Sequence, residues 1–486
     1  MASSTKEFDY GESYPRPIQG VERVSFLRRS VWHNAGFGSL RRIRTHIVAV
    51  EPRFVPTVYP HDVPGLPSRP EETAAADPAS TGSSDATNEE DCTLDPILTH
   101  CSVAQFRKAY LTGKLTPLAV VKALLPLIRR DISPPGIHST AWIDVKVDLA
   151  LQAAEASTLR YRNKRSLGPL DGVPAAVKDQ YDVEGYVTTL GSAHDFTRRE
   201  GDETYTSSCV QKLQDAGAII VGKLNMHEFA ADTSGINTTY GTPRNPYNKA
   251  YYTGGSSSGS AYAVAVGLVP ITLGTDGGGS IRIPASFCSV YGLKPSHGRL
   301  SYLPGVNQNS TCERAASRIG VPACPELARH ALASVRRPGC HRHRDHHHPY
   351  AQGLGVPEAW FDRAEPAVQD LCRSMIGWLV KNKGYAVVPI EIRFLVEGET
   401  AHALTVLSHT ATALPEATRA SPAVRIMLAL GRETGAGDYI LAQKLRQVLM
   451  QHLAWLWRER HPGMLIVTPT TAGAGWPIRD PGGEMG

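Results

Sequence analysis

Residues 254–280 carry two glycine-rich turns separated by apolar sequence. The stretch begins Gly254-Gly-Ser-Ser-Ser-Gly-Ser260 and ends Gly274-Thr-Asp-Gly-Gly-Gly-Ser280. Between the turns, small residues at 258–266 predict a helix, and apolar residues at 269–273 predict a buried strand. Glycine lets backbone N–H groups crowd round a negative charge, because no Cβ obstructs their approach. The turns therefore indicate an anion-binding site, and the structural alternative is a flexible loop.

A phosphate and an oxyanion are the two anions that such turns can bind. A phosphate loop of the Walker type needs a Lys-Ser or Lys-Thr pair after its glycines, and none follows here. Ser280 comes directly after three glycines. A serine at this place can attack a carbonyl carbon while the preceding N–H groups receive the developing oxyanion. This pattern favours a serine nucleophile.

The base for such a serine is less clear from the residues alone. No G-x-S-x-G elbow with a downstream Asp and His is present, so a Ser-His-Asp triad is unsupported. Lys178 ends the apolar segment 173–177 and can act as a base if burial keeps it neutral. Judged from that segment by itself, a solvated lysine paired with Asp179 is the simpler interpretation.

Strand-like and helix-like segments alternate along the chain. Ser102 and Gln105 form a capping-box pattern, and Thr116-Pro117 is a second helix start. The alternation predicts an α/β domain with a layered sheet. The helices are expected at 102–110, 117–128, 206–216, 258–266 and before Gly384, and the strands at 173–177, 218–221, 269–273, 386–392 and 464–468.

Four segments of the chain resemble the amidase signature family. They are Gly168-Pro-Leu-Asp-Gly-Val-Pro-Ala-Ala-Val-Lys178-Asp179, Gly222-Lys-Leu-Asn-Met-His-Glu-Phe229, Gly241-Thr-Pro-Arg-Asn-Pro246 leading to Gly254-Gly-Ser-Ser, and Gly274-Thr-Asp-Gly-Gly-Gly-Ser280-Ile-Arg-Ile-Pro284 running on to Gly292-Leu-Lys-Pro295. Ser256 precedes Ser280 by 24 residues (280 − 256), which is also the family's spacing. The likeness covers residues 96–303 and, less closely, 353–486, where it looks most like fungal amidases.

The resemblance implies the amidase signature fold, a large mixed β-sheet covered by helices on both faces. It also implies a Ser–cis-Ser–Lys triad, in which Ser280 is the nucleophile and Ser256 relays its proton to neutral Lys178. The peptide bond that enters Ser256 is then cis. The implied oxyanion hole is made by the backbone N–H groups of Gly277, Gly278, Gly279 and Ser280. Supporting hydroxyls are expected from Ser257 and Thr275, and structural roles from Asp276 and Arg282.

The implied reaction converts a carboxylic amide into a carboxylate and an amine or ammonia, through an acyl-enzyme on Ser280. The substrate is a small-molecule amide, and neither a cofactor nor a metal is expected. Two alternatives stay open. One is an amidotransferase-type subunit of the same superfamily, and the other is a catalytically impaired product of an altered gene. The extension at 1–95 favours the free-standing amidase over the subunit.

Two regions depart from the family pattern. Residues 1–95 are predicted to form an extension with a strand-like stretch at 45–50 and a disordered linker at about 67–91, and residues 96–486 form the catalytic domain. Residues 306–350 resemble nothing in the family, through a frame error or a lineage-specific insertion. They are expected not to pack with the domain, and residues 336–349 are expected to be exposed and irregular. The C-terminal end looks truncated beside the family.

The composition limits the classes of binding partner and the cellular compartment that we expect for this chain. The formal net charge is +5, too small to predict a nucleic-acid or membrane partner. No apolar run approaches the roughly 20 residues of a membrane span, and no secretory signal is recognised. Eight cysteines without a C-x-x-C pair predict free thiols and a cytoplasmic protein. A homodimer is left open. No metal site is predicted from the histidine run, which lacks a partner pair at ligand spacing: His341, His343, His346, His347 and His348.

Overall fold

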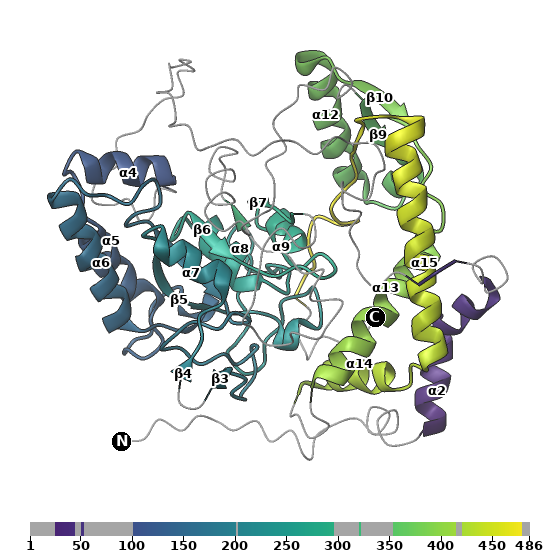
Figure 1. The fold of residues 1–486 in the computed structure, drawn as a ribbon, viewed down its shortest axis with the longest axis horizontal. Helices are drawn as coiled ribbons and strands as arrows, with labels where there is room; N and C mark the ends of the chain where they lie inside the picture. Colours follow the sequence, from purple (N-terminus) through teal and green to yellow (C-terminus); the bar gives the residue numbers. More distant parts are fainter. Residues whose placement is uncertain are drawn as a thin grey trace, which may run out of the picture.

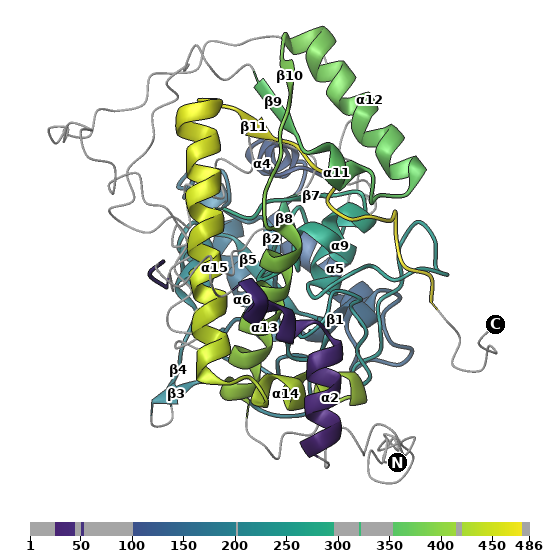
Figure 2. The ribbon, with the colours of Figure 1, turned by 90° about the vertical axis from the view of Figure 1, so that its right-hand side faces the viewer.

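The computed structural model describes residues 25–43, 50–52, 101–200, 203–295, 320–321, 353–414 and 420–478. Figures 1 and 2 show a β-sheet region that holds α4 to α9, and beside it a helical region of α13, α14, α15 and α2. A smaller unit of α12, β9 and β10 lies near one end of α15. The helical region joins elements far apart in the chain, since α2 precedes the sheet region and α13 to α15 follow it.

The larger sheet has six strands in the order β1-β5-β2-β6-β8-β7. β2 is parallel to β5 and to β6, whereas β1 is antiparallel to β5. Every residue of β2, β5 and β6 is buried, as expected for parallel strands covered on both faces. The predicted α/β class is therefore confirmed. The strands are β1 (Trp142–Asp144), β2 (Pro174–Lys178), β5 (Ile219–Leu224), β6 (Ile271–Leu273), β7 (Tyr291–Gly292) and β8 (Gly320–Val321).

Helices cover both faces of this sheet because successive strand residues point to opposite sides. Ala175 and Val177 of β2 pack in one cluster with α4 and α7, and Ala176 packs in another cluster with α5, α6 and α8. The capping box of Ser102 and Gln105 is present at the start of α4, as predicted. These helices are α4 (Val103–Leu111), α5 (Pro117–Ile128), α6 (Val147–Arg162), α7 (Ser208–Asp215) and α8 (Ser258–Ala265).

Two smaller sheets accompany the large mixed sheet among the described residues. A separate parallel sheet has the order β10-β9-β11, and a two-stranded ribbon pairs β3 with β4. Gly384 ends α12 with φ 71°, as its place in the sequence predicted. The remaining elements are β3 (Arg199–Glu200), β4 (Glu203–Thr204), α9 (Arg282–Phe287), β9 (Gly353–Val356), α11 (Glu358–Phe361), α12 (Pro366–Lys383), β10 (Ala386–Pro389), α13 (Leu395–Ala413), α14 (Pro422–Arg432), α15 (Ala436–Trp455) and β11 (Leu465–Ile466).

The N-terminal extension contains a helix that the sequence analysis did not predict, α2 (Ser25–Asn34), followed by a 3₁₀ helix, η1 (Phe37–Ile43). Trp32 and Leu40 are buried in one cluster with apolar residues of α13, α14 and α15. Arg41 forms an ion pair with Asp438 of α15 at 2.6 Å. Such contacts over long sequence distances stabilise a short helix that local propensity alone would not. The predicted stretch at 45–50 falls mostly outside the described residues, and the linker at 67–91 lies wholly outside them.

The segment 306–350 packs with the domain in at least one place. Gly320–Val321 forms β8, whose backbone pairs antiparallel with β6 and β7. The expectation that this segment stays apart from the domain is therefore wrong at 320–321. The reason is that β6 would be an edge strand without β8, and the backbone groups of such an edge pair with any extended neighbour, whatever its side chains. Residues 336–349 and the histidine run lie outside the described residues.

The cysteines depart in part from the prediction of free thiols. Cys101 is disulfide-bonded, so the prediction is wrong for this residue. Cys209, Cys288 and Cys372 form no disulfide. Within the described ranges, none of the helices has the length and apolar character that crossing a bilayer requires.

The packing of α5 and α6 against the sheet can be tested by shortening single side chains. Leu124 of α5 is 0% exposed. We expect Leu124→Ala to lower the free energy of unfolding by about 2–5 kcal/mol, because it removes buried methyl groups and leaves a cavity. Leu159 of the adjacent α6 is 55% exposed, so Leu159→Ala should change the free energy of unfolding by no more than about 0.5 kcal/mol. Urea unfolding of both variants measures this difference, and equal losses would contradict the described packing.

Candidate active site

Lys178 is the last residue of β2 and is fully buried. Its Nζ lies 2.7 Å from Oγ of Ser256 and 2.7 Å from Oγ1 of Thr275. The contact between Lys178 and Ser256 is the one that the resemblance led us to expect. A solvated lysine at a strand end, the simpler interpretation of the segment alone, is wrong because β2 lies between β5 and β6.

Asp179 has a buried cationic partner on the neighbouring strand. It forms an ion pair with Lys223 of β5 at 2.9 Å, and both side chains are 0% exposed. Oδ2 of Asp179 also accepts hydrogen bonds from the backbone N–H groups of Thr189, at 3.0 Å, and Gly191, at 3.2 Å. The sequence analysis quoted Lys223 within a family segment but gave it no role. Asp179, the residue after Lys178 in the chain, therefore has a buried cation of its own.

The turn that carries Ser256 is clamped by residues 227–235. The Gly255–Ser256 peptide bond is cis, as the resemblance implied. The carbonyl of Ser256 accepts a hydrogen bond from the N–H of His227 at 2.9 Å, and the N–H of Gly255 donates to the carbonyl of Thr233 at 2.6 Å. A Cβ on Gly235 would lie 2.5 Å from the Gly254 oxygen. Only glycine fits at position 235, so this backbone packing depends on residue type.

Asp276 holds the second turn in place through hydrogen bonds to its backbone. Its carboxylate accepts hydrogen bonds from the Gly279 N–H at 2.7 Å, the Ile281 N–H at 3.2 Å and Nε of Arg282 at 2.8 Å. Burial would raise the pKa of Asp276, but Arg282 and these backbone donors hold the pKa below its usual range. The structure thus agrees with the structural place expected for Asp276 and Arg282. It differs for Gly279, whose N–H is directed at Asp276 and not at an oxyanion.

Ser257 and Thr275 connect the two turns. The hydroxyl of Ser257 lies 3.3 Å from both the carbonyl and the N–H of Thr275, and the Ser257 N–H donates to the carbonyl of Ser280 at 3.1 Å. Thr275 Oγ1 also donates to the side chain of Gln180 at 2.6 Å. The predicted site residues therefore come together from β2 and the two turns.

Ser280, Gly277 and Gly278 line a cavity of about 370 Å³. Its wall was not predicted, because much of it comes from α13, which carries none of the family segments and is more than 100 positions away in the chain. The residues that complete the wall are Gln180, Leu190, Phe229, Ala230, Ala231, Asp232, Thr233, Thr275, His402, Ala403, Val406, Leu407, His409, Thr410, Ala413, Leu414 and Met427. Most of those from α13 and α14 are apolar.

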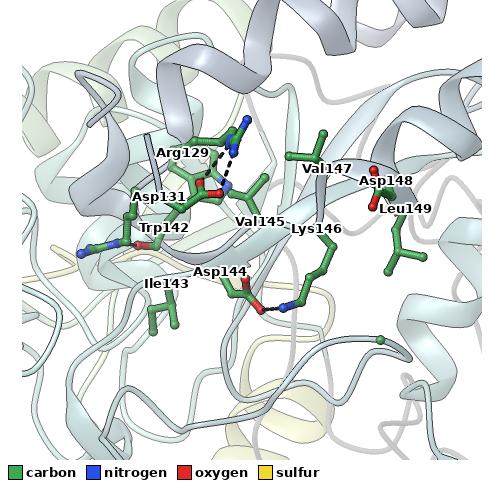
Figure 3. A pocket seen from close by; sticks show the side chains of 12 residues that line it. Arg129, Asp131, Trp142, Ile143, Asp144, Val145, Lys146, Val147, Asp148 and Leu149 are labelled. Carbon is green, nitrogen blue, oxygen red and sulfur yellow. Dashed lines mark hydrogen bonds and ion pairs between the residues drawn. The ribbon is translucent and has the colours of Figure 1, made fainter. Parts of the chain in front are cut away.

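A second hollow, of about 720 Å³, lies at β1 and the start of α6 (Figure 3). Four of its charged side chains form two ion pairs: Arg129 with Asp131 at 2.6 Å, and Lys146 with Asp144 at 2.9 Å. The residues that line it include no serine, threonine, cysteine or histidine. This hollow therefore offers no hydroxyl, thiol or imidazole nucleophile, and the smaller cavity at Ser280 is the candidate active site.

The buried ion pair gives a test of this geometry. We expect Lys223→Met to lower the free energy of unfolding by about 3–5 kcal/mol, because it leaves the Asp179 carboxylate buried without its cation. Lys146→Met is the matched control: its partner Asp144 is partly exposed, and losing that pair should cost no more than about 1 kcal/mol. Urea unfolding at pH 7 compares them. A loss for Lys223→Met as small as that of the control would contradict the burial described for this pair.

Residues 137–323 match the family model described as Amidase. A fatty acid amide hydrolase of Arabidopsis thaliana is 34% identical over 78% of this chain and 65% of its own length. One from Medicago truncatula is 32% identical over 76% of this chain and 63% of its own. A glutamyl-tRNA(Gln) amidotransferase subunit from Chloroflexus aurantiacus is 43% identical over 42% of this chain and 40% of its own. The chain thus spans less than two thirds of the length of these relatives.

Solved structures share the fold. A crystal structure titled as an amidase aligns with a TM-score of 0.62 and 27% identity over 74% of this chain and 80% of that one. A structure titled as a vestigial complex that reveals the origins of an s-triazine catabolic enzyme aligns with a TM-score of 0.64 and 27% identity, over 78% and 83%.

These findings correct one expectation and leave another without support. The family match reaches residue 323, so the expected loss of resemblance from 306 is wrong over residues 306–323. The three relatives come from plants and a bacterium, and so do not support a particular likeness to fungal amidases. By its match to the Amidase model over residues 137–323, its relatives and its fold, the chain is similar to amidase signature enzymes over about three quarters of its length.

Proposed function

We propose that this protein is an amidase that hydrolyses a carboxylic amide through an acyl-enzyme on Ser280, with Ser256 and Lys178 as its proton relay. The observation that carries the proposal is the 2.7 Å contact between Lys178 Nζ and Ser256 Oγ at the buried end of β2. The cavity beside this contact is lined by Ser280. The names of the plant relatives, fatty acid amide hydrolases, support the same chemistry.

Each residue has one task in the proposed reaction. Ser280 attacks the amide carbon, and its proton passes through Ser256 to Lys178. Burial of an amine favours its neutral form, which is the form that accepts a proton. The developing oxyanion lies against the N–H groups of Gly277 and Gly278, since that of Gly279 donates to Asp276. The same relay then protonates the leaving nitrogen, and water hydrolyses the ester.

The cavity wall supports an apolar acyl group as part of the substrate. Val406 and Leu407 of α13, and Met427 of α14, line the cavity. Each buried CH₂ contributes about 0.8 kcal/mol of transfer free energy. An alkyl chain on the acyl group of the substrate would gain this transfer free energy by lying along α13.

An amidotransferase-type subunit is the second candidate function. It is favoured by the relative from Chloroflexus aurantiacus, a subunit of an amidotransferase that is 43% identical over 204 residues. The apolar lining from α13 and α14 argues for the hydrolase, because glutamine has no apolar chain to fill it. Hydrolysis of decanamide by the purified chain, with no activity on glutamine, separates the two. A catalytically impaired product would hydrolyse neither.

Substitution of the relay tests the proposed roles. We expect Ser280→Ala to abolish amide hydrolysis and covalent labelling by a fluorophosphonate. Lys178→Ala and Ser256→Ala should each lower kcat by about 10⁴-fold or more, since the three groups act as a unit. Ser286→Ala, an exposed serine on α9, is the control and should keep full activity. Labelling retained in Ser280→Ala would require a different nucleophile.

The length of the acyl chain tests the apolar wall. We expect kcat/KM for straight-chain primary amides to rise about fourfold per CH₂ until the cavity is filled, from the 0.8 kcal/mol that each buried CH₂ contributes. Val406→Asn should reduce this slope, because Val406 lines the cavity. Val396→Asn, on an exposed part of the same helix, should not. A slope independent of Val406 would exclude α13 as the acyl wall.

A further inference from the structure

The cavity beside Ser280 carries one formal charge among its described lining residues, on Asp232. Burial would raise the pKa of Asp232, but hydrogen bonds from Ser234 and from the Thr233 backbone lower it, so this group is a carboxylate at neutral pH. Desolvation lowers the pKa of His402 and His409, which are therefore neutral there. The wall is thus negative at one place and uncharged elsewhere.

Asp232 is held on the side of the cavity where Ser256 lies. Phe229 and Ala230 both have φ 56°, a left-handed conformation that turns the chain sharply just before Asp232. The next residue, Thr233, accepts a hydrogen bond from the Gly255 N–H at 2.6 Å. Ser234 Oγ donates to Oδ2 of Asp232 at 2.7 Å, which fixes the carboxylate. The loop therefore sets Asp232 beside the turn that carries Ser256.

The part of the cavity next to Ser256 is where the leaving amine of the substrate would lie. Under the proposed reaction, Ser256 delivers the proton to the leaving nitrogen, so that nitrogen and its substituent lie toward Ser256. The acyl group points the other way, to α13. Arg446 of α15 acts electrostatically on both His402 and His409 of α13, so a positive charge lies near the α13 side of the cavity. A cation on the amine side would meet Asp232, and an anion there would be repelled.

We propose that Asp232 is a specificity-determining residue that selects amides whose leaving amine carries an ammonium group or another hydrogen-bond donor. This inference rests on the proposed hydrolase function. Asp232 does not take part in the proton relay. It acts on binding of the substrate's amine portion, through charge attraction across a partly exposed cavity wall.

Three substrates of similar size with one acyl group test the inference at pH 8: N-(2-aminoethyl)decanamide, N-propyldecanamide and N-(carboxymethyl)decanamide. For the wild-type protein we expect kcat/KM to be roughly fivefold higher for the ammonium compound than for the propyl compound, and roughly fivefold lower for the carboxylate, the scale of a partly exposed charge pair. Asp232→Asn keeps the shape and should bring the three values together. Raising NaCl from 50 to 500 mM should have the same effect in the wild type.

Two controls separate a local charge effect from other causes. Asp215→Asn removes an exposed carboxylate of α7 outside the cavity wall and should leave the three values in their wild-type ratio. The propyl compound should react at nearly the wild-type rate in Asp232→Asn, because it has no charge to lose. An equal loss for all three compounds in Asp232→Asn would overturn the inference and show a merely structural residue.

The inference and the proposed function fail in different ways. If the wild-type protein hydrolyses all three amides with the same kcat/KM, the inference fails and the hydrolase stands. If it hydrolyses none and takes no fluorophosphonate label, the proposed function fails. The dissociation constants of the three amides on Ser280→Ala then make the same comparison without turnover. Tighter binding of the ammonium compound, lost with Asp232→Asn, supports the charge selection, and equal dissociation constants overturn it.

Discussion

The burial of Lys178 inside a sheet is the constraint on which the rest of the site depends. An amine at the end of a central parallel strand has no bulk water around it, so it must be given polar neighbours. Ser256 and Thr275 supply them, each at 2.7 Å. The adjacent carboxylate, Asp179, is held by Lys223 on the neighbouring strand. The two buried lysines thus have different contacts. Lys223 on β5 forms the ion pair with Asp179, and Lys178 on β2 contacts Ser256.

The turns around Lys178 are held by backbone groups more than by side chains. Residues 227–235 bind the turn at Ser256, and Asp276 gathers the N–H groups of the turn at Ser280. Such contacts need close approach, which explains why glycine recurs in both turns. At Gly235 a Cβ would lie 2.5 Å from another residue's oxygen. The glycine pattern seen in the sequence is therefore a pattern of tight backbone packing as well as of anion binding.

The central strands and the contact between Lys178 and Ser256 could be predicted from the sequence, because they depend on local motifs with fixed spacing. The paired buried lysines were not predicted, since no local signal says that Asp179 pairs with a lysine on β5. Gly279 was given the wrong hydrogen-bond partner because its N–H direction depends on Asp276, three residues earlier. The cavity wall of α13 was missed for a different reason. Its residues contact the turns only through the tertiary fold, and no motif marks them.

The helix α2 lies in the segment that a division of the chain at residue 95 would discard. Trp32 and Leu40 of that segment are buried against α13 and its neighbours, and α13 forms the apolar wall of the cavity. A shortened protein that begins after residue 95 would keep every residue of the proton relay. It would lack the packing that fixes the position of the substrate-facing helix. The choice of expression boundary thus determines whether an assay measures the specificity of the whole protein or only the chemistry of its sheet.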